Sequence, residues 1–277
     1  MSAGTIHDAE YLREFFERDY EAVAADPAVE SAHEALLQHL EAGTLRSAER
    51  GKGGDWTANA WIKRAILAGF KRTKTIEYEG PGFGYFDKSG YPPRAFVIDS
   101  GVRLVPGGSS VRRGAYVAKG VVIMPPAFIN VGAWVGAGTM VDSHALVGSC
   151  AQVGERVHLS AGAQIGGVLE PAGAVPVVVE NDVFVGALAG VFEGVVVHER
   201  AVLAAGVVLT GSSVVYDLVN GRELRREVPA GAVVVPGTRP GSTPFAIERG
   251  LQLAAPMIVK YRDAKTDAAT ALEGALR

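Results

Sequence analysis

Asp142 and His144 are the residues of this chain whose types and spacing best suit proton transfer. They flank Ser143 in the run Met140-Val141-Asp142-Ser143-His144. A carboxylate can orient a nucleophile such as an amine, and histidine is the side chain that exchanges protons most readily near neutral pH. Each has a plainer alternative, a surface carboxylate for Asp142 and a packing side chain for His144. The pair is therefore a candidate catalytic centre that the surrounding fold must position.

Two other chemistries fit the sequence poorly. His144, His158 and His198 occupy different positions of a six-residue repeat and form no closely spaced pair, so we expect no zinc site. The glycine-rich stretch 106–110 lacks the strand, lysine and helix that surround a phosphate-binding loop, and an ordinary turn is the better interpretation. We therefore expect no metal and no permanently bound cofactor.

Composition and charge narrow the class of protein. The 277 residues carry a net charge of −3, which argues against nucleic acid as the main partner. The single cysteine, Cys150, excludes an internal disulfide framework and suits a reducing cytoplasm. The N-terminus has acidic residues where a signal peptide needs basic and apolar ones, and no apolar run approaches about 18 residues. We expect a cytoplasmic protein that does not enter the membrane.

One aliphatic residue returns at every sixth position over most of the chain. This period fits neither an α-helix nor a long strand, but it is typical of the hexapeptide repeat of a parallel β-helix. Three hexads make one triangular coil, and coils stack at about 4.8 Å. A valine-rich sandwich would not keep the phase through so many repeats, which amount to about five coils. The repeated residues are Val111, Val117, Ile123, Ile129, Val135, Val141, Val147, Val153, Leu159 and Ile165, then Val179, Val185, Val191, Val197, Leu203 and Leu209.

Small residues and interruptions refine this β-helix. A small or β-branched residue stands four places after each repeated aliphatic residue except Ile165, where the repeat is interrupted, and is expected to fill a corner of the coil. Glycines often follow the aliphatic residue directly, as in Gly136, Gly148, Gly154, Gly166 and Gly186, and we expect turns with unusual backbone angles there. Insertions predict external loops at 170–178 and 214–227, the second a hairpin that turns at Asn220-Gly221.

The flanking segments predict smaller domains on either side of the repeat. We expect a helical α/β domain over 1–102, the β-helix over 103–239 and a C-terminal extension over 240–277. The predicted helices are 8–23, capped by Asp8, then 27–40, closed by Gly43, then 59–70 and 268–276. The predicted strands outside the repeat are 96–98, 102–105 and 256–261.

Several segments of the chain resemble one enzyme family. The most specific are Val147-Gly148-Ser149-Cys150-Ala151-Gln152-Val153-Gly154 and Gly166-Gly167-Val168-Leu169-Glu170-Pro171. These runs resemble tetrahydrodipicolinate N-succinyltransferase, a member of the hexapeptide acyltransferase superfamily, whose left-handed β-helices usually form trimers that hold acyl-CoA between neighbouring subunits. The other matching segments are 40–46, 61–67, 105–107, 111–115, 138–142, 228–231 and 263–266.

The resemblance implies a set of functional residues. Asp142 matches an aspartate that contacts the acceptor, and Arg103 matches a substrate-binding arginine. Histidine serves as general base in other hexapeptide acyltransferases, which favours a catalytic role for His144. The further residues implied for the substrate are Ser160, Leu188 and Gly190, and those implied for acyl-CoA are Gly167, Ala187, Ala205, Gly206, Lys260 and Lys265.

The chain departs from the family pattern near this implied site. The family carries Gly-Ala-Arg-Ser-Glu where this chain has Gly186-Ala187-Leu188-Ala189-Gly190. An arginine and a glutamate are thus replaced by Leu188 and Gly190, which implies a more apolar pocket. The family's Asp-Thr-Trp reads Asp142-Ser143-His144, and Asp267 stands in place of an arginine after Lys265.

The resemblance implies an acyl-CoA-dependent N-acyltransferase that works as a homotrimer. The first expectation is succinyl transfer from succinyl-CoA to tetrahydrodipicolinate, an amino-dicarboxylate, in lysine and diaminopimelate biosynthesis. One alternative is a paralogue with a changed acceptor or with acetyl-CoA as donor, in specialised metabolism such as tabtoxin-type biosynthesis. Another is a catalytically degenerate scaffold that binds CoA without turnover.

Overall fold

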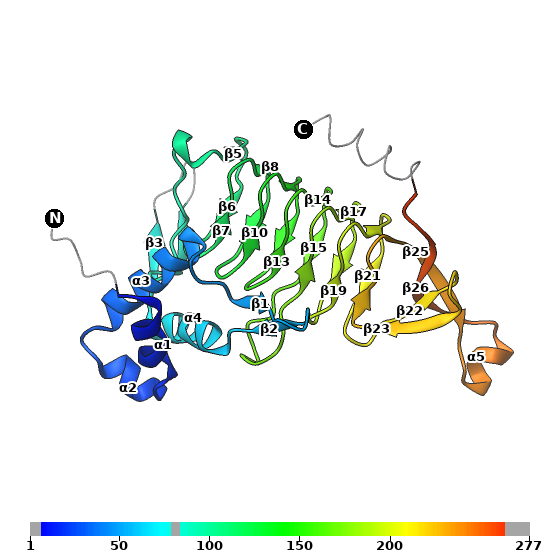
Figure 1. Ribbon diagram of the computed structural model, residues 1–277, viewed down its shortest axis with the longest axis horizontal. Helices are drawn as coiled ribbons and strands as arrows, with labels where there is room; N and C mark the ends of the chain where they lie inside the picture. Colours follow the sequence, from blue (N-terminus) through cyan, green and yellow to red (C-terminus); the bar gives the residue numbers. More distant parts are fainter. Residues whose placement is uncertain (1–6, 79–83, 264–277) are drawn as a thin grey trace.

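The hexads form the strands of a parallel β-helix, which occupies the middle of the molecule in Figure 1. The computed structural model describes residues 7–78 and 84–263. Each hexad contributes a short strand that pairs in parallel with the strand one coil later. Val117, Val135 and Val153 are partners in this way, at intervals of 18 residues. Three hexads therefore make one coil, as the period predicts.

Three parallel sheets form the sides of the prism. Sheet 1 contains β5 (Arg103–Leu104), β8 (Val122–Ile123), β11 (Met140–Val141), β14 (His158–Leu159), β17 (Phe184–Val185) and β20 (Val202–Leu203). Sheet 2 contains β6 (Ser110–Val111), β9 (Phe128–Ile129), β12 (Leu146–Val147), β15 (Gln164–Ile165), β18 (Gly190–Val191) and β21 (Val208–Leu209). Sheet 3 contains β7 (Tyr116–Val117), β10 (Trp134–Val135), β13 (Gln152–Val153), β16 (Val178–Val179), β19 (Val196–Val197) and β24 (Glu227–Val228).

The core of the prism confirms the predicted burial pattern. Every repeated aliphatic residue from Val111 to Leu209 is buried, and most have no exposed surface. The small residues four places later are buried too, as at Ala115, Val121 and Ala163, except Ser213 after the last repeat, which is half-buried. From β6 onward, the second residue of each prism strand is buried in the core while the first lies on the outer face; Leu104 of β5, at the end of the stack, is exposed. Burial of the aliphatic column is what keeps successive coils in register.

The glycines that follow the aliphatic residues have a different cause from the one predicted. Their backbone angles are not left-handed; positive φ occurs instead at other glycines, such as Gly138 and Gly162. A Cβ atom at Gly136 would lie 2.5 Å from the carbonyl carbon of Gly154 in the next coil. At Gly186 it would lie 2.6 Å from the backbone nitrogen of Ala205. Close approach between stacked coils, rather than φ, therefore excludes side chains there.

The turns between sheets form three edges along the prism. The first edge joins sheets 1 and 2 at 142–144, 160–162, 186–188 and 204–206. The second joins sheets 2 and 3 at 148–150 and 192–194 and carries the longer connections 166–177 and 210–226. The third joins sheets 3 and 1 at 154–156, 180–182 and 198–200. Both predicted external loops lie on the second edge.

The first predicted helix is two helices, α1 (Ala9–Glu17) and α2 (Tyr20–Ala25). Asp8 caps α1 as predicted, its Oδ1 accepting from the backbone N–H of Tyr11 at 2.8 Å. The chain is extended at Arg18, whose guanidinium donates to the carbonyl of Phe15 at 3.0 Å and pairs with Asp26 at 3.0 Å. These contacts end α1 where the hydrophobic spacing alone predicts continuation.

The other helices of the N-terminal part lie close to their predicted positions. They are α3 (Val29–Ala42), closed by Gly43 in the left-handed conformation, and α4 (Ala60–Arg72). Two antiparallel pairs accompany them: β1 (Ala48–Arg50) with β2 (Trp56–Ala58), and β3 (Thr75–Tyr78) with β4 (Tyr85–Lys88). Residues 96–98 do not form the expected strand, because the chain turns there into η1 (Ile98–Ser100), which ends at left-handed Gly101.

The N-terminal helices pack on one end of the β-helix, and the β1–β2 pair runs along its side (Figure 1). Their core includes Val131 and Cys150 from the coils. Ser47 donates to the carbonyl of Gly132 at 2.8 Å, and Arg46 donates to Gln152 Oε1 at 2.5 Å. Segments far apart in the sequence thus form one continuous body.

The opposite end of the β-helix is extended by hairpins (Figure 1). The predicted hairpin consists of β22 (Val214–Asp217) and β23 (Arg222–Arg225), with left-handed Gly221 in its turn. A long pair, β25 (Ala232–Pro240) and β26 (Gln252–Tyr261), joins sheet 1, so the predicted tail strand begins earlier than expected. The short α5 (Pro244–Glu248) lies between them and was not predicted. The predicted helix 268–276 lies outside the described residues. Within those residues, no helix is long and apolar enough to cross a bilayer.

Candidate active site

The first edge brings most of the sequence-predicted site residues into rows. The backbone N–H of the third residue in each turn donates to a carbonyl of the equivalent turn one coil earlier. The backbone N–H of Leu188 donates to Ala161 at 3.0 Å, and that of Gly206 donates to Ala187 at 2.9 Å. Successive rows are about 4.8 Å apart, the spacing of paired strands. The residues gathered there are Asp142, His144, Ser160, Ala187, Leu188, Ala205 and Gly206.

Asp142 and His144 occupy one turn of this edge, directly after β11. The Oδ1 atom of half-buried Asp142 accepts from the backbone N–H of Ser143 at 2.7 Å. His144 is exposed and has a φ of 62°, and its backbone N–H donates to the carbonyl of Pro126 at 2.5 Å. Histidine is one of the residues that tolerate this conformation best. The backbone therefore fixes both side chains on a short, accessible turn.

Leu188 and Gly190 make the neighbouring surface apolar. Leu188 is 74% exposed with a φ of 58°, and its side chain lies over Gly162. A Cβ atom at Gly190 would lie 2.5 Å from the ring of Phe192, which also covers Gly166. Gly190 is therefore buried beneath an aromatic ring and offers no side chain of its own. This part of the edge presents hydrocarbon where the family pattern has charges.

Three predicted residues lie away from the first edge. Arg103 is exposed on β5 and is two strands from Met140 in sheet 1, about 10 Å along the stack. Lys260 lies on β26 and pairs with Asp263 at 3.6 Å. Gly167 lies on the second edge. Lys265 is outside the described residues.

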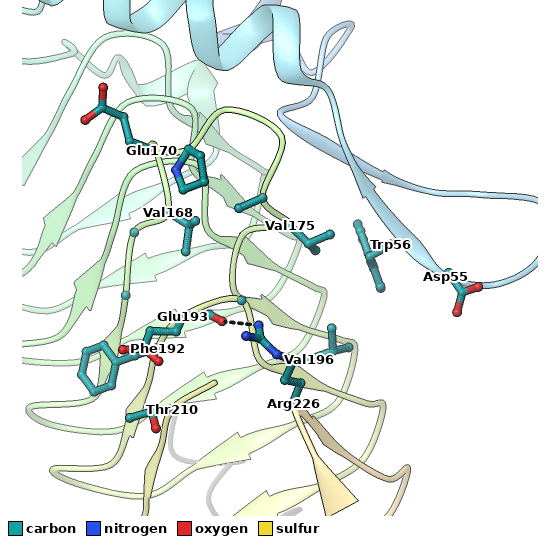
Figure 2. Close-up of a pocket in the computed structure, with 15 residues that line it drawn as sticks. Asp55, Trp56, Val168, Glu170, Val175, Phe192, Glu193, Val196, Thr210 and Arg226 are labelled. Atoms are coloured by element: carbon teal, nitrogen blue, oxygen red, sulfur yellow. Dashed lines mark hydrogen bonds between the residues drawn. The ribbon is translucent and has the colours of Figure 1, made fainter. Parts of the chain in front are cut away.

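A large cleft opens on the second edge and contains Gly167 (Figure 2). Its volume is about 920 Å³, in the upper part of the range for small-molecule sites. Phe192 and Val168 form part of its apolar wall, and Trp56 closes it from the β1–β2 pair. The interruption of the hexads was the sequence signal for the loop in this wall. No local pattern indicated that Trp56 or Arg226 would join it.

Two charged side chains of the cleft form hydrogen bonds with backbone groups. Arg226 donates to the carbonyl oxygen of Glu193 at 3.4 Å, as Figure 2 shows. The Glu193 carboxylate accepts from the backbone N–H of Gly211 at 3.0 Å. Asp55 and Glu170 lie at the margin of the cleft. The cleft thus combines an apolar wall with an arginine and several carboxylates at its rim.

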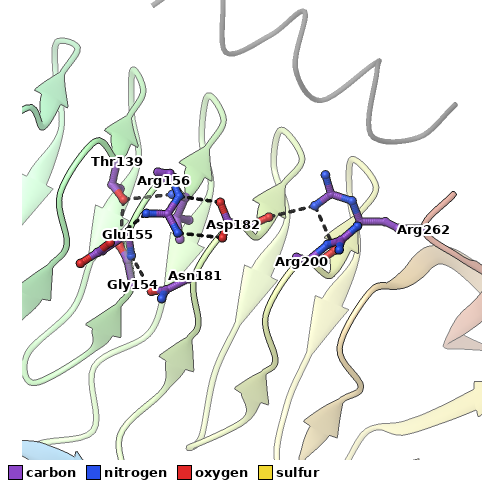
Figure 3. Close-up of polar contacts among 9 residues, drawn as sticks. Thr139, Gly154, Glu155, Arg156, Asn181, Asp182, Arg200 and Arg262 are labelled. Carbon is purple, nitrogen blue, oxygen red and sulfur yellow. Dashed lines mark hydrogen bonds and ion pairs between the residues drawn. The ribbon is translucent and has the colours of Figure 1, made fainter. Parts of the chain in front are cut away.

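The third edge is closed by contacts among its own side chains (Figure 3). The Arg156 guanidinium donates to both carboxylate oxygens of Asp182, at 2.8 and 2.9 Å. Arg262 donates to the carbonyls of Asp182 and Arg200 at 3.0 and 3.2 Å. Thr139 donates to the carbonyl of Gly154 at 2.8 Å. These charges stabilise neighbouring coils. A smaller cavity of about 320 Å³ lies beside them, lined by Glu155 and Glu180 of this edge together with Arg46 and Trp56.

The buried carboxylate of Glu180, in the turn 180–182 of the third edge, binds a residue of the N-terminal part through a hydrogen bond. Glu180 accepts from Trp56 Nε1 at 2.9 Å, from His198 Nδ1 at 3.2 Å and from the backbone N–H of Glu199 at 3.1 Å. Although burial opposes ionisation, hydrogen bonds from His198 and Trp56 lower the pKa of Glu180 to about 2. The hydrogen bond to Glu180 raises the pKa of His198.

Comparisons with known proteins place this architecture in a family. A family model for the N-terminal part of tetrahydrodipicolinate N-succinyltransferase matches residues 10–71, and one for the hexapeptide repeat of succinyl-transferase matches residues 176–211. A solved structure from Campylobacter jejuni, named as a 2,3,4,5-tetrahydropyridine-2-carboxylate N-succinyltransferase, aligns with a TM-score of 0.53 at 18% identity. That alignment covers 87% of this chain and 64% of the other, and it supports the fold alone.

Sequence relatives are much closer. A 2,3,4,5-tetrahydropyridine-2,6-dicarboxylate N-succinyltransferase from Azoarcus sp. (strain BH72) is 48% identical over 259 residues, which cover 92% of each chain. The protein of the same name from Aromatoleum aromaticum is 46% identical with the same coverage. Identity at this level over nearly the whole length shows that the chain belongs to the tetrahydrodipicolinate N-succinyltransferase family.

Proposed function

We propose that the protein transfers the succinyl group of succinyl-CoA to the amino group of 2-amino-6-oxopimelate, the ring-opened form of tetrahydrodipicolinate. The observation that carries this proposal is the row of site residues on the first edge, in a chain 48% identical to a named N-succinyltransferase. The pathway is the biosynthesis of lysine and diaminopimelate, and the location is the cytoplasm.

The chemistry needs a neutral amine next to a thioester. The amine nitrogen attacks the thioester carbonyl, the C–N bond forms, the C–S bond breaks and the proton lost by the amine ends on the CoA thiolate. Asp142 orients the amine, and His144, accessible on the same turn, takes the ammonium proton. Arg103 and Ser160 are proposed to bind the acceptor.

The acyl-CoA is proposed to lie across sheet 2, from the first edge to the cleft. Leu188 and Phe192 are four residues apart, at most about 14 Å along an extended chain. A thioester at the first edge therefore leaves the cofactor arm within reach of Gly167 in the cleft. Ala187, Ala205 and Gly206, on the first edge, are proposed to contact the thioester end of this path. Lys260 lies on β26 beside β25 in sheet 1, so its proposed contact with the cofactor requires a path that also reaches sheet 1.

We further propose an assembly and a hand for the β-helix. The coils wind left-handed, about five of them within the regular hexads, and three copies associate with their sites between neighbouring chains. Shared sites would supply charges that the Leu188–Gly190 segment of one chain lacks.

A thiol-release assay tests the function. Purified protein is mixed with succinyl-CoA or acetyl-CoA and with 2-aminopimelate as a stable acceptor, and free CoA thiol is measured. We expect turnover with succinyl-CoA. Preference for acetyl-CoA would favour the second candidate, a changed donor, which the exposed Leu188 and the ring over Gly190 support. Tight CoA binding without turnover on any pair would favour a scaffold.

A further inference from the structure

Lys63 of α4 is a fully buried cation that contacts the external loop of the second edge. Its side chain has no exposed surface. The ammonium donates to the carbonyl of Ala174 at 2.7 Å and to that of Pro171 at 3.3 Å. Within residues 7–78 and 84–263, no carboxylate lies within ion-pair distance of it. Two loop carbonyls are therefore its principal partners.

The contact joins parts of the chain that are about a hundred residues apart. Ile62 and Ile66, on either side of Lys63, are buried in the N-terminal core, so α4 is a rigid base for the side chain. Leu169, at the start of the loop, packs against the same core. The loop is thus held at one point by apolar contact and at two carbonyls by the ammonium.

The residues held in this way belong to the wall of the cleft. Pro171 and Ala174 line the cleft together with Gly167 and Val175. Isolating an ammonium from water is unfavourable, and a methionine of similar size would avoid that cost. A cation at this position is therefore poorly explained by packing alone. It is well explained if the ammonium fixes the carbonyls of this loop, in addition to the packing of Leu169 and the hydrogen bond from the Val168 N–H to the carbonyl of Ser149 at 3.2 Å.

We propose that Lys63 is a positioning residue for acyl-CoA binding, because it fixes the loop that forms the wall of the cleft beside Gly167. This rests on the proposed function, in which acyl-CoA reaches Gly167. Lys63 does not touch the reacting atoms. It sets the width of the cleft from the N-terminal part of the molecule.

The test compares Lys63→Met with Arg64→Met. Arg64 is a control at the next, exposed position of α4, and among the described residues its ion pair is a 4.0 Å surface contact with Glu17. Hydrogen exchange of the 168–177 segment, the Kd of CoA and the steady-state constants for succinyl-CoA are measured for both. For Lys63→Met we expect faster exchange in the loop and KM and Kd raised about tenfold, with kcat within about threefold of wild type. Arg64→Met should match wild type.

Each deviation has a meaning. If hydrogen exchange of the loop is unchanged in Lys63→Met, then Lys63 does not fix the loop. If exchange is faster but KM and Kd are unchanged, then Lys63 does not position the loop for acyl-CoA binding. Lys63→Gln, which keeps a shorter donor, should give intermediate values and replaces Lys63→Met if that variant does not fold. Exchange and CoA affinity need no turnover, so a wild type that binds CoA but transfers nothing would overturn succinyl transfer while Lys63 is still tested.

Discussion

The first and third edges of the prism share one backbone and differ in their side chains. Both place non-glycine residues in the left-handed conformation at equivalent turn positions, His144 and Leu188 on the first edge, Arg156 and Asp182 on the third. On the third edge these side chains pair with each other across coils. Arg156 is exposed too, but the exposed side chains of His144 and Leu188 on the first edge make no such pair within the described residues. The repeat supplies the turns, and only the side chains decide which edge is available to a ligand.

The largest expected difference between the edges is catalytic. Asp142→Ala should reduce turnover with succinyl-CoA by about a hundredfold or more, because the amine loses the group that orients it. Thiol release at saturating substrates measures this, with size-exclusion chromatography to confirm an unchanged assembly. Asp182→Ala is the matched change on the third edge and should keep turnover, at a cost of at most about 1 kcal/mol in unfolding free energy. Wild-type turnover in Asp142→Ala would refute the role assigned to Asp142.

Among the changes on the third edge, we expect the loss of the buried Glu180 carboxylate to reduce the free energy of unfolding most. Glu180→Gln keeps the size of the side chain but weakens its acceptor role toward Trp56 and His198. We expect a loss of about 2 kcal/mol in unfolding free energy, since hydrogen bonds to a charged group are involved. Denaturant unfolding measures the change, and Trp56 fluorescence reports whether the β1–β2 pair is displaced. An unaltered transition midpoint would show that the network adds nothing to stability.

The same network predicts a pH window for stability. Because the pKa of His198 is raised in the folded protein, its stabilising contribution is full below its ordinary pKa of 6.5 and is lost as pH rises through the higher folded value. Glu180, with a pKa lowered from 4.5 to about 2, loses its contribution as pH falls through that range. Melting temperature should therefore decline on both sides of about pH 5 to 6.5. His198→Gln should flatten the basic side, and an unchanged basic slope would contradict the assignment.

The smallest effect is expected at the exposed apolar position of the first edge. Leu188→Gly removes the strain of a left-handed backbone at a residue with a side chain, but it raises the conformational entropy of the unfolded chain. The two effects oppose each other, so the free energy of unfolding should change by less than about 1 kcal/mol. KM for the acyl donor should rise, because hydrocarbon is lost from the site. Arg156→Gly, at the equivalent turn position of the third edge, should leave KM unchanged. Equal changes of KM in both variants would show that the first edge does not bind the acyl donor differently from the third.

Residue patterns determined the β-helix and its core. The six-residue period is local, and burial of the aliphatic column from Val111 to Leu209 forces coils of three hexads whatever surrounds them. Within an uninterrupted run the period also fixes which residues share an edge, as it does for Asp142 and Ser160, which are 18 residues apart. Leu188 lies beyond the break after Ile165, and only the pairing of Val179 with Val153 shows that it belongs to the same edge. Local patterns were less reliable outside the repeat. Arg18 ends α1 through contacts with Phe15 and Asp26 that hydrophobic spacing does not encode.

Tertiary structure alone decided what packs around the second edge and its cleft. The cleft is assembled from Trp56, the loop near Gly167 and Arg226, which come from three separate segments. The ring of Phe192 covers Gly190, and Lys63 reaches the carbonyls of a loop more than a hundred residues later. Such contacts depend on where side chains and insertions lie once the coils have stacked. A repeat specifies its own packing because each unit repeats the last, but it carries no information about the irregular segments that pack against it.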